Sequence, residues 1–155
     1  MKENKNDNRV EIYSLSEDAA HCEYPYVGII PAGFPSPADD FYFEPLDILS
    51  KYMKNPESIF IGRAYGLSMD GFISDGDYFY MDRSLRASAV DGDIAVCAVE
   101  GEFTLKKLKF TAAGIDLIPY NENFPVISVS ENDNFSVWAI VTLIIRPTPT
   151  RWLRS

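Results

Sequence analysis

The sequence predicts a mainly β protein: a curled β-sheet or small barrel with one short helix and an extended N-terminal arm. Short apolar and β-branched runs, separated by tight-turn residues, fill most of residues 58–145. Only the stretch Pro45–Lys54 has apolar residues at helical spacing. Residues 1–31 are polar and mixed, without a helical period of useful length. The length of 155 residues suits one domain.

The expected strands are bounded by Gly, Asp and Asn, which favour turns. They are Ser58–Tyr65, Asp77–Asp82, Asp93–Val99, Phe103–Phe110, Ile115–Pro119, Val126–Ser130 and Ser136–Ile145. The Glu100-Gly-Glu102 segment lies between two apolar runs and predicts a hairpin.

The expected helix, Pro45–Lys54, begins with a proline, which suits a first helical position, and ends before an Asn-Pro pair. The preceding segment Ala32–Pro37 holds two prolines and two small residues, which predicts an extended, exposed linker. The last residues, Arg146–Ser155, carry three arginines and two prolines and are expected to form an exposed end.

Charge and composition exclude several kinds of site. The 14 Lys and Arg against 23 Asp and Glu give a net charge of −9, which argues against a broad DNA-binding face. A single histidine, His21, and two cysteines, Cys22 and Cys97, cannot build a multi-histidine or four-cysteine zinc site. We therefore expect no metal and no cofactor, and Cys97 is expected to be a small core residue.

The sequence shows no signal peptide, and its longest apolar run, Val137–Ile145, is about half of what a membrane helix needs. A cytoplasmic protein with reduced cysteines, without membrane contact, is the resulting expectation.

Four aspartates, Asp75, Asp77, Asp91 and Asp93, resemble a carboxylate cluster. Because Asp-Gly pairs are typical of turns, we expect these residues to shape turns and not to bind a metal.

Ser68 follows Gly66 by two residues, where a predicted strand ends. A tight turn of this kind can bring backbone N–H groups together near the serine oxygen, as in an oxyanion hole. An ordinary turn serine explains the same pattern.

Two adjacent lysines, Lys106 and Lys107, interrupt an apolar strand. Strand side chains alternate between faces, so one of the two points toward the packed side unless the strand is an exposed edge. A buried lysine has a lowered pKa, and its neutral amine can act as a general base. Alternation does not choose between Lys106 and Lys107. Without a suitable histidine, a serine–lysine pair is the simplest nucleophile–base pair that this sequence offers.

Five segments in order carry a resemblance to a known family. They are Ala32-Gly-Phe-Pro-Ser-Pro-Ala38, Gly66-Leu-Ser-Met69 with Ile73-Ser-Asp-Gly-Asp77, Asp91-Gly-Asp-Ile94, Gly101-Glu-Phe-Thr-Leu-Lys-Lys-Leu108 and Leu117-Ile-Pro-Tyr-Asn121. Together they resemble the LexA-like self-cleaving serine peptidases, and among them the UmuD-type proteins of SOS mutagenesis. The resemblance runs from about residue 30 to about residue 145.

The resemblance implies a role for each matching position. Ser68 would be the nucleophile, Lys106 the general base, and Ala32–Gly33 the scissile bond. The backbone N–H groups of Leu67 and Ser68 would hold the oxyanion. Residues 1–32 would form an arm removed by self-cleavage, and residues 33–155 a LexA-like peptidase domain.

The resemblance also implies partners. A RecA filament on single-stranded DNA would activate cleavage, and the trimmed homodimer would serve as accessory subunit of a Y-family, UmuC-like translesion polymerase, without specific DNA binding of its own. One alternative is a binding module of the same fold that regulates the polymerase as a dimer without cleavage. A LexA-type repressor is disfavoured, since 31 residues before Ala32 do not supply a DNA-binding domain.

Overall fold

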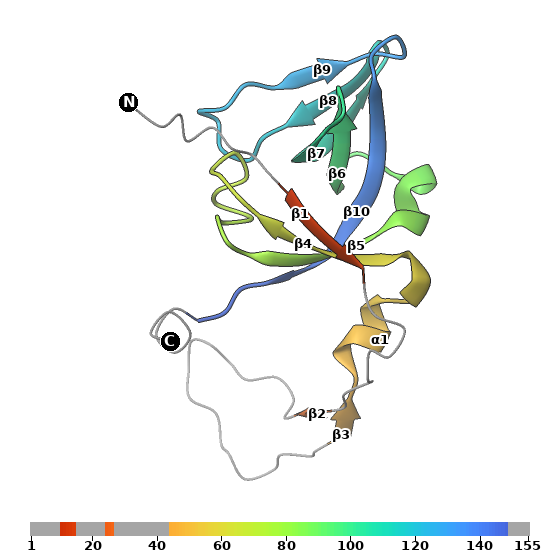
Figure 1. Ribbon diagram of the computed structural model, residues 1–155, viewed down its shortest axis with the longest axis vertical. Helices are drawn as coiled ribbons and strands as arrows, with labels where there is room; N and C mark the ends of the chain where they lie inside the picture. The colour runs from red at the N-terminus through yellow and green to blue at the C-terminus, as the bar shows by residue number, and fades with distance from the viewer. Residues whose placement is uncertain (1–9, 15–23, 27–43, 149–155) are drawn as a thin grey trace. The chain divides into compact units, whose positions relative to one another are not determined.

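A computed structural model describes residues 10–14, 24–26 and 44–148 of the chain (Figure 1). The chain divides into two compact units, residues 16–54 and residues 1–15 with 55–155. No helix of the described residues is long and apolar enough to cross a membrane.

In the smaller unit, β2 (Tyr24–Tyr26) pairs antiparallel with β3 (Glu44–Leu46), and the helix α1 (Ile48–Tyr52) follows. The helix predicted at Pro45–Lys54 is therefore shorter than expected, because Pro45 lies in β3. Asp47 caps the helix, and its carboxylate accepts hydrogen bonds from the Ser50 N–H (3.0 Å) and hydroxyl (2.5 Å). Aspartate is a strong N-cap residue, which explains why the helix begins after Asp47.

The larger unit is built on one antiparallel sheet of eight strands, in the order β1-β4-β5-β10-β6-β7-β8-β9 (Figure 1). The strands are β1 (Val10–Ser14), β4 (Ile59–Ala64), β5 (Tyr78–Asp82), β6 (Ile94–Val99), β7 (Glu102–Thr111), β8 (Gly114–Ile118), β9 (Ile127–Val129) and β10 (Phe135–Ile145). Each of the seven strands predicted between residues 58 and 145 is present with closely similar bounds, which confirms the mainly β fold.

The sheet is curled but not closed. Its two edge strands, β1 and β9, do not pair with each other, although the curl brings β1 near β7. The long strand β10 joins the two halves, with β5 on one side and β6 on the other. Its register shifts against both neighbours, and bulges of this kind bend and twist a strand.

Three elements of this unit were not expected from the sequence. β1 lies within the stretch predicted to be an extended arm, where no strand was expected. Two short 3-10 helices, Pro56–Ser58 and Arg83–Ser88, flank β4 and β5. The predicted hairpin between β6 and β7 is present. Glu100 and Gly101 both have positive φ (51° and 83°), as the tight turn of a two-residue hairpin requires.

The carboxylates of the aspartates shape turns, as the sequence indicated. Asp93 accepts a hydrogen bond from the Val90 N–H (2.9 Å) and Asp77 one from the Ser74 N–H (2.8 Å), each across a turn. Asp91 instead accepts one from the Phe110 N–H of β7 (2.6 Å). Among the residues that the structure describes, no group of His, Cys, Asp and Glu could hold a metal ion.

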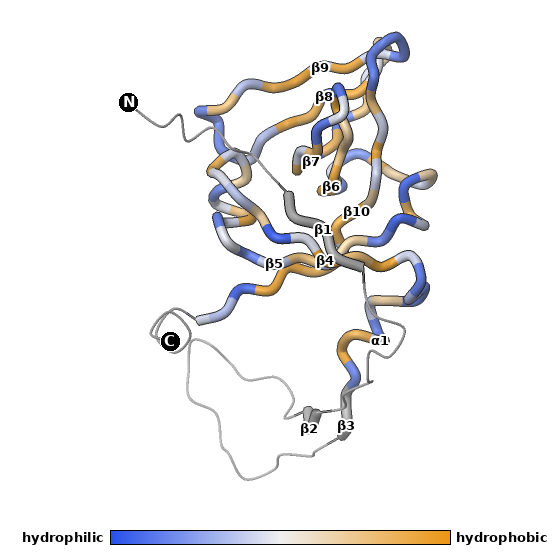
Figure 2. The backbone as a smooth tube through the Cα atoms, viewed as in Figure 1, coloured by the Kyte–Doolittle hydropathy of each residue, from blue (hydrophilic) through white to orange (hydrophobic). Residues whose placement is uncertain are grey.

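Two apolar clusters form the core of the larger unit, and neighbouring residues of β6 and β10 alternate between them. Val96 and Ala139 belong to one cluster, whereas Cys97 and Ile140 belong to the other. Cys97 is fully buried, as expected for a core residue. Figure 2 shows apolar residues along these central strands, with polar residues gathered in the connecting loops. The central strands are thus supported on both faces, and they provide a rigid base for the loops that connect them.

Candidate active site

Ser68 lies in the loop that follows β4, and only 5% of it is exposed. Tight turns form the loop, with the Asp70 N–H donating to the Leu67 carbonyl (3.1 Å) and the Ile73 N–H donating to the Met69 carbonyl (2.8 Å). Gly66 and Gly71 have φ values of 90° and 95°, which side-chain-bearing residues rarely adopt.

A loop from the opposite part of the sheet holds this turn in place. The Asn121 N–H donates to the Ser68 carbonyl (3.0 Å), and the Asn121 side-chain amide donates to the Leu67 carbonyl (3.0 Å). Both carbonyls of the Leu67–Ser68 turn are therefore fixed by one residue. Within the described part of the chain, the N–H groups of Leu67 and Ser68 donate to no other group. These two N–H groups thus remain available to an acceptor that is not part of the folded loop.

Lys106 lies in the middle of β7 with only 2% of its surface exposed. Its Nζ donates to Ser68 Oγ (3.0 Å), Thr104 Oγ1 (2.9 Å) and the Leu105 carbonyl (3.1 Å). Alternation along the strand did not indicate whether Lys106 or Lys107 points toward the packed side. In the structure Lys106 contacts Ser68, whereas Lys107 is on the other face of β7 and partly exposed.

Burial of the amine determines its acid–base chemistry. Loss of solvation lowers the pKa of Lys106 from its ordinary value of 10.5 to about 8, against a smaller opposing effect of Cys97. Burial likewise raises the pKa of the Cys97 thiol to about 12, so this group is neutral in the range where Lys106 titrates. Lys106 therefore loses its proton near neutral pH, where ordinary lysines are charged.

The hydrogen bonds of Lys106 fix the direction of its lone pair. A neutral amine has two N–H donors and one lone pair. Thr104 Oγ1 and the Leu105 carbonyl accept from the two donors, and the third direction points to Ser68 Oγ. In the neutral state the lone pair thus faces the serine hydroxyl, which is the arrangement that a general base requires.

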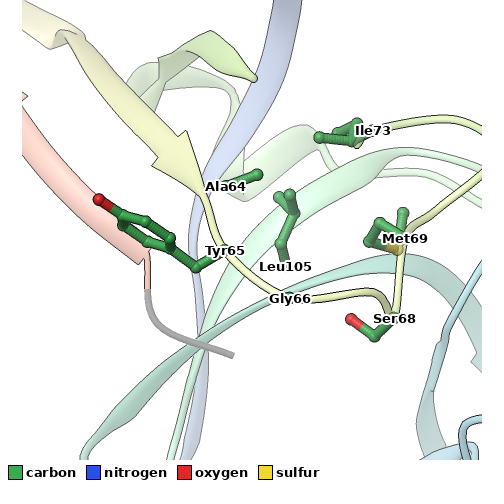
Figure 3. A pocket seen from close by; sticks show the side chains of 7 residues that line it. All are labelled: Ala64, Tyr65, Gly66, Ser68, Met69, Ile73 and Leu105. Carbon is green, nitrogen blue, oxygen red and sulfur yellow. The ribbon is translucent and has the colours of Figure 1, made fainter. Parts of the chain in front are cut away.

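A small pocket lies beside the serine. It is lined by Ala64, Tyr65, Gly66, Ser68, Met69, Ile73 and Leu105. Figure 3 shows Ser68 at the far end of the loop that begins at Gly66, with the side chains of Leu105 and Met69 nearby. The mostly apolar lining and small size suit a small apolar side chain next to a reacting carbonyl.

An ion pair supports the loop that follows the serine. Arg146 Nε donates to Asp77 Oδ1 (2.9 Å) and Arg146 Nη2 to Oδ2 (2.5 Å), and Asp77 is 4% exposed. Burial raises the pKa of Asp77, but the Arg146 guanidinium and the Ser74 N–H outweigh it and hold that pKa below its ordinary value. Arg146 was expected in an exposed tail, and half of its side chain is exposed, but its guanidinium connects the end of β10 to this loop.

Several residues singled out in the sequence lie outside the described residues. They are the expected cleavage-site residues Ala32 and Gly33, the residues His21 and Cys22, and the tail arginines Arg151 and Arg154. Conversely, Thr104 and Asn121 were not expected to serve the site. Asn121 does lie in the segment Leu117–Asn121, which resembles the family, and this resemblance is the sequence feature that could have indicated its role.

The fold and this site, with a buried serine beside a buried lysine, resemble those of a class of serine peptidase. Residues 25–142 match the Peptidase S24-like family. The chain is 36% identical over 137 residues to Protein MucA of Salmonella typhimurium, covering 86% of this chain and 92% of that protein. It is 34% identical over 119 residues to Protein SamA of the same species, covering 76% of this chain and 81% of that protein.

A LexA repressor of Clostridium kluyveri is 36% identical over 127 residues, covering 79% of this chain and 60% of that repressor. The chain therefore belongs to the S24 peptidase family, the self-cleaving serine peptidases of the SOS response, and is a LexA-like protein of the UmuD type.

We predict that the free energy of unfolding rises with pH because of Lys106. The unfolded chain keeps this proton up to about pH 10.5, whereas the folded chain loses it near pH 8. Between these values the unfolded state binds more protons, so stability increases with pH, by about 3 kcal/mol in total. The measurement is urea unfolding from pH 7 to 10, comparing the unsubstituted chain with Lys106→Met.

The Lys106→Met chain should lack this rise, whereas Lys107→Met, the matched control at a partly exposed neighbour, should keep it. Parallel stability curves for the unsubstituted and Lys106→Met chains would show that the amine is not desolvated.

Proposed function

We propose that the chain is a self-cleaving Ser-Lys peptidase that cuts its own Ala32–Gly33 bond. The observation that carries the proposal is the 3.0 Å contact between Lys106 Nζ and Ser68 Oγ, both buried in the same site. The lowered pKa of the amine and the two available N–H groups at the turn supply the other requirements of acyl transfer.

The proposed reaction begins when the lone pair of Lys106 takes the proton of the Ser68 hydroxyl. Ser68 Oγ then attacks the carbonyl carbon of Ala32, and the N–H groups of Leu67 and Ser68 donate hydrogen bonds to the developing oxyanion. The Lys106 ammonium gives its proton to the nitrogen of Gly33, and the peptide bond breaks. Water, deprotonated by Lys106, hydrolyses the Ser68 ester and leaves a new carboxylate on residue 32.

The pocket beside Ser68 supports this choice of bond. A small apolar lining matches the methyl side chain of Ala32, and glycine after it leaves room for the close approach of Ser68 Oγ. The linker around residues 32–37 must enter the site in an extended form. The cleavage rate therefore depends on the fraction of molecules in which the linker occupies the site.

A further part of the proposal concerns the role of the trimmed chain. We infer that it acts in the cytoplasm as a homodimeric accessory subunit of a Y-family, UmuC-like translesion polymerase, and that a RecA filament on single-stranded DNA favours the cleavage-competent state. The likeness to MucA and SamA supports this role. So does the net charge of −9, since the chain would reach DNA through its partners and not by direct, specific binding.

Self-cleavage should accelerate with pH and level off above about pH 9, because the reactive form holds Lys106 neutral. With a pKa of about 8, about one tenth of the amine is neutral at pH 7 and most of it at pH 9. The purified chain is incubated without RecA at pH 6 to 10, and intact mass follows the appearance of a fragment that begins at Gly33.

Ser68→Ala should abolish the fragment, and Lys107→Ala should leave the profile unchanged. The absence of a fragment at every pH, or an equal rate in Ser68→Ala, would contradict the proposed chemistry.

Asn121→Ala should slow self-cleavage by about tenfold or more, because small displacements of a nucleophile are costly. The pH at half-maximal rate should stay unchanged, since the surroundings of Lys106 are kept. Asn123→Ala is the matched control: its backbone N–H donates to Asn121 Oδ1 (3.0 Å), and that bond survives the substitution. If Asn121→Ala instead moves the pH midpoint, the residue acts through the base and not by positioning the turn.

The cellular role is tested by damage-induced mutagenesis in bacteria that lack their own protein of this kind but keep the polymerase. A chain that begins at Gly33 should restore mutagenesis, and full-length Ser68→Ala should not. The chain beginning at Gly33 with Ser68→Ala is the matched control and should restore it, because the nucleophile has no further task. Full activity of uncut Lys106→Ala would instead favour the non-cleaving binding module.

A further inference from the structure

The strand β1 lies at one edge of the eight-stranded sheet, and among the described strands it pairs with β4 alone. Figure 1 shows β1 in red beside β4. The register is antiparallel, with Glu11 opposite Arg63, Ile12 opposite Gly62 and Tyr13 opposite Ile61. β1 therefore covers the edge that β4 would otherwise present to solvent.

The backbone bonds at the end of β4 show which of its groups face β1. The Ala64 N–H donates to the Asp77 carbonyl (2.8 Å), and the Ala64 carbonyl accepts from the Gly76 N–H (2.7 Å), so Ala64 faces the segment leading into β5. Successive residues of an antiparallel strand direct these groups to alternate sides. The N–H and carbonyl groups of Ile61 and Arg63 thus face β1.

β1 also precedes the proposed cleavage site in the chain. Among the described residues, a cut after residue 32 would leave the first segment attached to the rest by the β1–β4 pairing, by the contact of β1 with β7 and by the three-residue pairing of β2 with β3. Loss of this fragment would leave four backbone groups of Ile61 and Arg63 unpaired. Such an open edge readily accepts a strand from another protein.

We propose that the β4 edge is a strand-acceptor site for a partner protein. β1 occupies it in the intact chain, and an extended segment of the partner occupies it once the arm has left. The proposal rests on the proposed self-cleavage for the timing of exposure, but the acceptor edge itself is a property of β4.

The register also indicates the chemistry of the partner segment. It runs antiparallel to β4 and places an acidic residue opposite Arg63, as Glu11 does in β1. The Arg63 guanidinium lies 5.3 Å from the ring centres of both Tyr65 and Tyr78, which hold a positive charge at this point of the edge. Opposite charges at facing positions of paired strands are stabilising.

The first experiment opens the edge without a cut. In full-length Ser68→Ala, the further change Tyr13→Pro removes a backbone donor that faces β4, whereas Ile12→Pro, its matched control, removes one that faces away. Residue-resolved hydrogen exchange should show the Ile61 and Arg63 amides exchanging about tenfold faster or more in the Tyr13→Pro chain only. The Ala64 amide, which faces the other way, should be unchanged.

The second experiment measures acceptance of a strand. The probe is a fluorescent peptide of residues 8–16, which should bind the Tyr13→Pro chain and the self-cleaved chain, but not the intact chain. Methylation of the peptide's Tyr13 nitrogen should weaken binding at least about tenfold, and methylation of its Ile12 nitrogen should have little effect. Glu11→Lys in the peptide should also weaken it, most strongly at low salt.

The outcomes separate the two proposals. Peptide binding to the Tyr13→Pro chain, together with no self-cleavage of the unsubstituted chain at any pH, would refute the proposed peptidase function and support the acceptor edge. Equal effects of the two methylations, or equal exchange in the two proline variants, would overturn the acceptor edge. A fragment 1–32 that stays bound to the cleaved chain and excludes the peptide would also overturn it, since the edge would never become available.

Discussion

The buried contact between the Lys106 amine and the Ser68 hydroxyl is the constraint on which the rest of the site depends. An amine in the middle of a strand loses the water that stabilises its charge, and this loss lowers its pKa to about 8. Packing of the surrounding sheet must offset the cost of burying the amine. The folded chain thereby holds an amine that is available as a base near pH 8, with its lone pair directed by Thr104 and the Leu105 carbonyl.

The fold supplies this contact from two distant parts of the chain. β7 is a central strand, and it holds Lys106 rigidly between β6 and β8. Ser68 comes from a loop, which a sheet alone would not fix. Asn121, from the connection after β8, binds both carbonyls of the Leu67–Ser68 turn and so ties the loop to the same half of the sheet that carries the lysine. The serine hydroxyl and the lysine amine therefore share one rigid frame.

The sequence predicted what is decided locally. The alternation of apolar residues and the turn residues located seven strands, because both signals lie within each strand's own sequence and the residues next to it. The bounds of α1 were wrong because Pro45 pairs with Pro25 in β2–β3, a contact between distant residues. For the same reason β1 was missed: its five residues form a strand through pairing with β4. Alternation could not choose between Lys106 and Lys107, since the answer depends on which face of β7 meets the serine loop.

The position of β1 before the proposed cleavage site changes what the proposed cut would do physically. While the arm is covalently attached, β1 occupies the β4 edge as a tethered strand, and the tether raises its effective concentration above that of a free segment. A partner segment at micromolar concentration would compete poorly against it. The proposed cleavage would remove the tether and leave a strand of five residues that must hold its place as part of a free fragment, with the short β2–β3 pairing as a further described attachment. A change in connectivity can thus expose a binding edge while the sheet itself keeps its structure. Because β4 runs directly into the Ser68 loop, that edge lies next along the chain to the site proposed to make the cut.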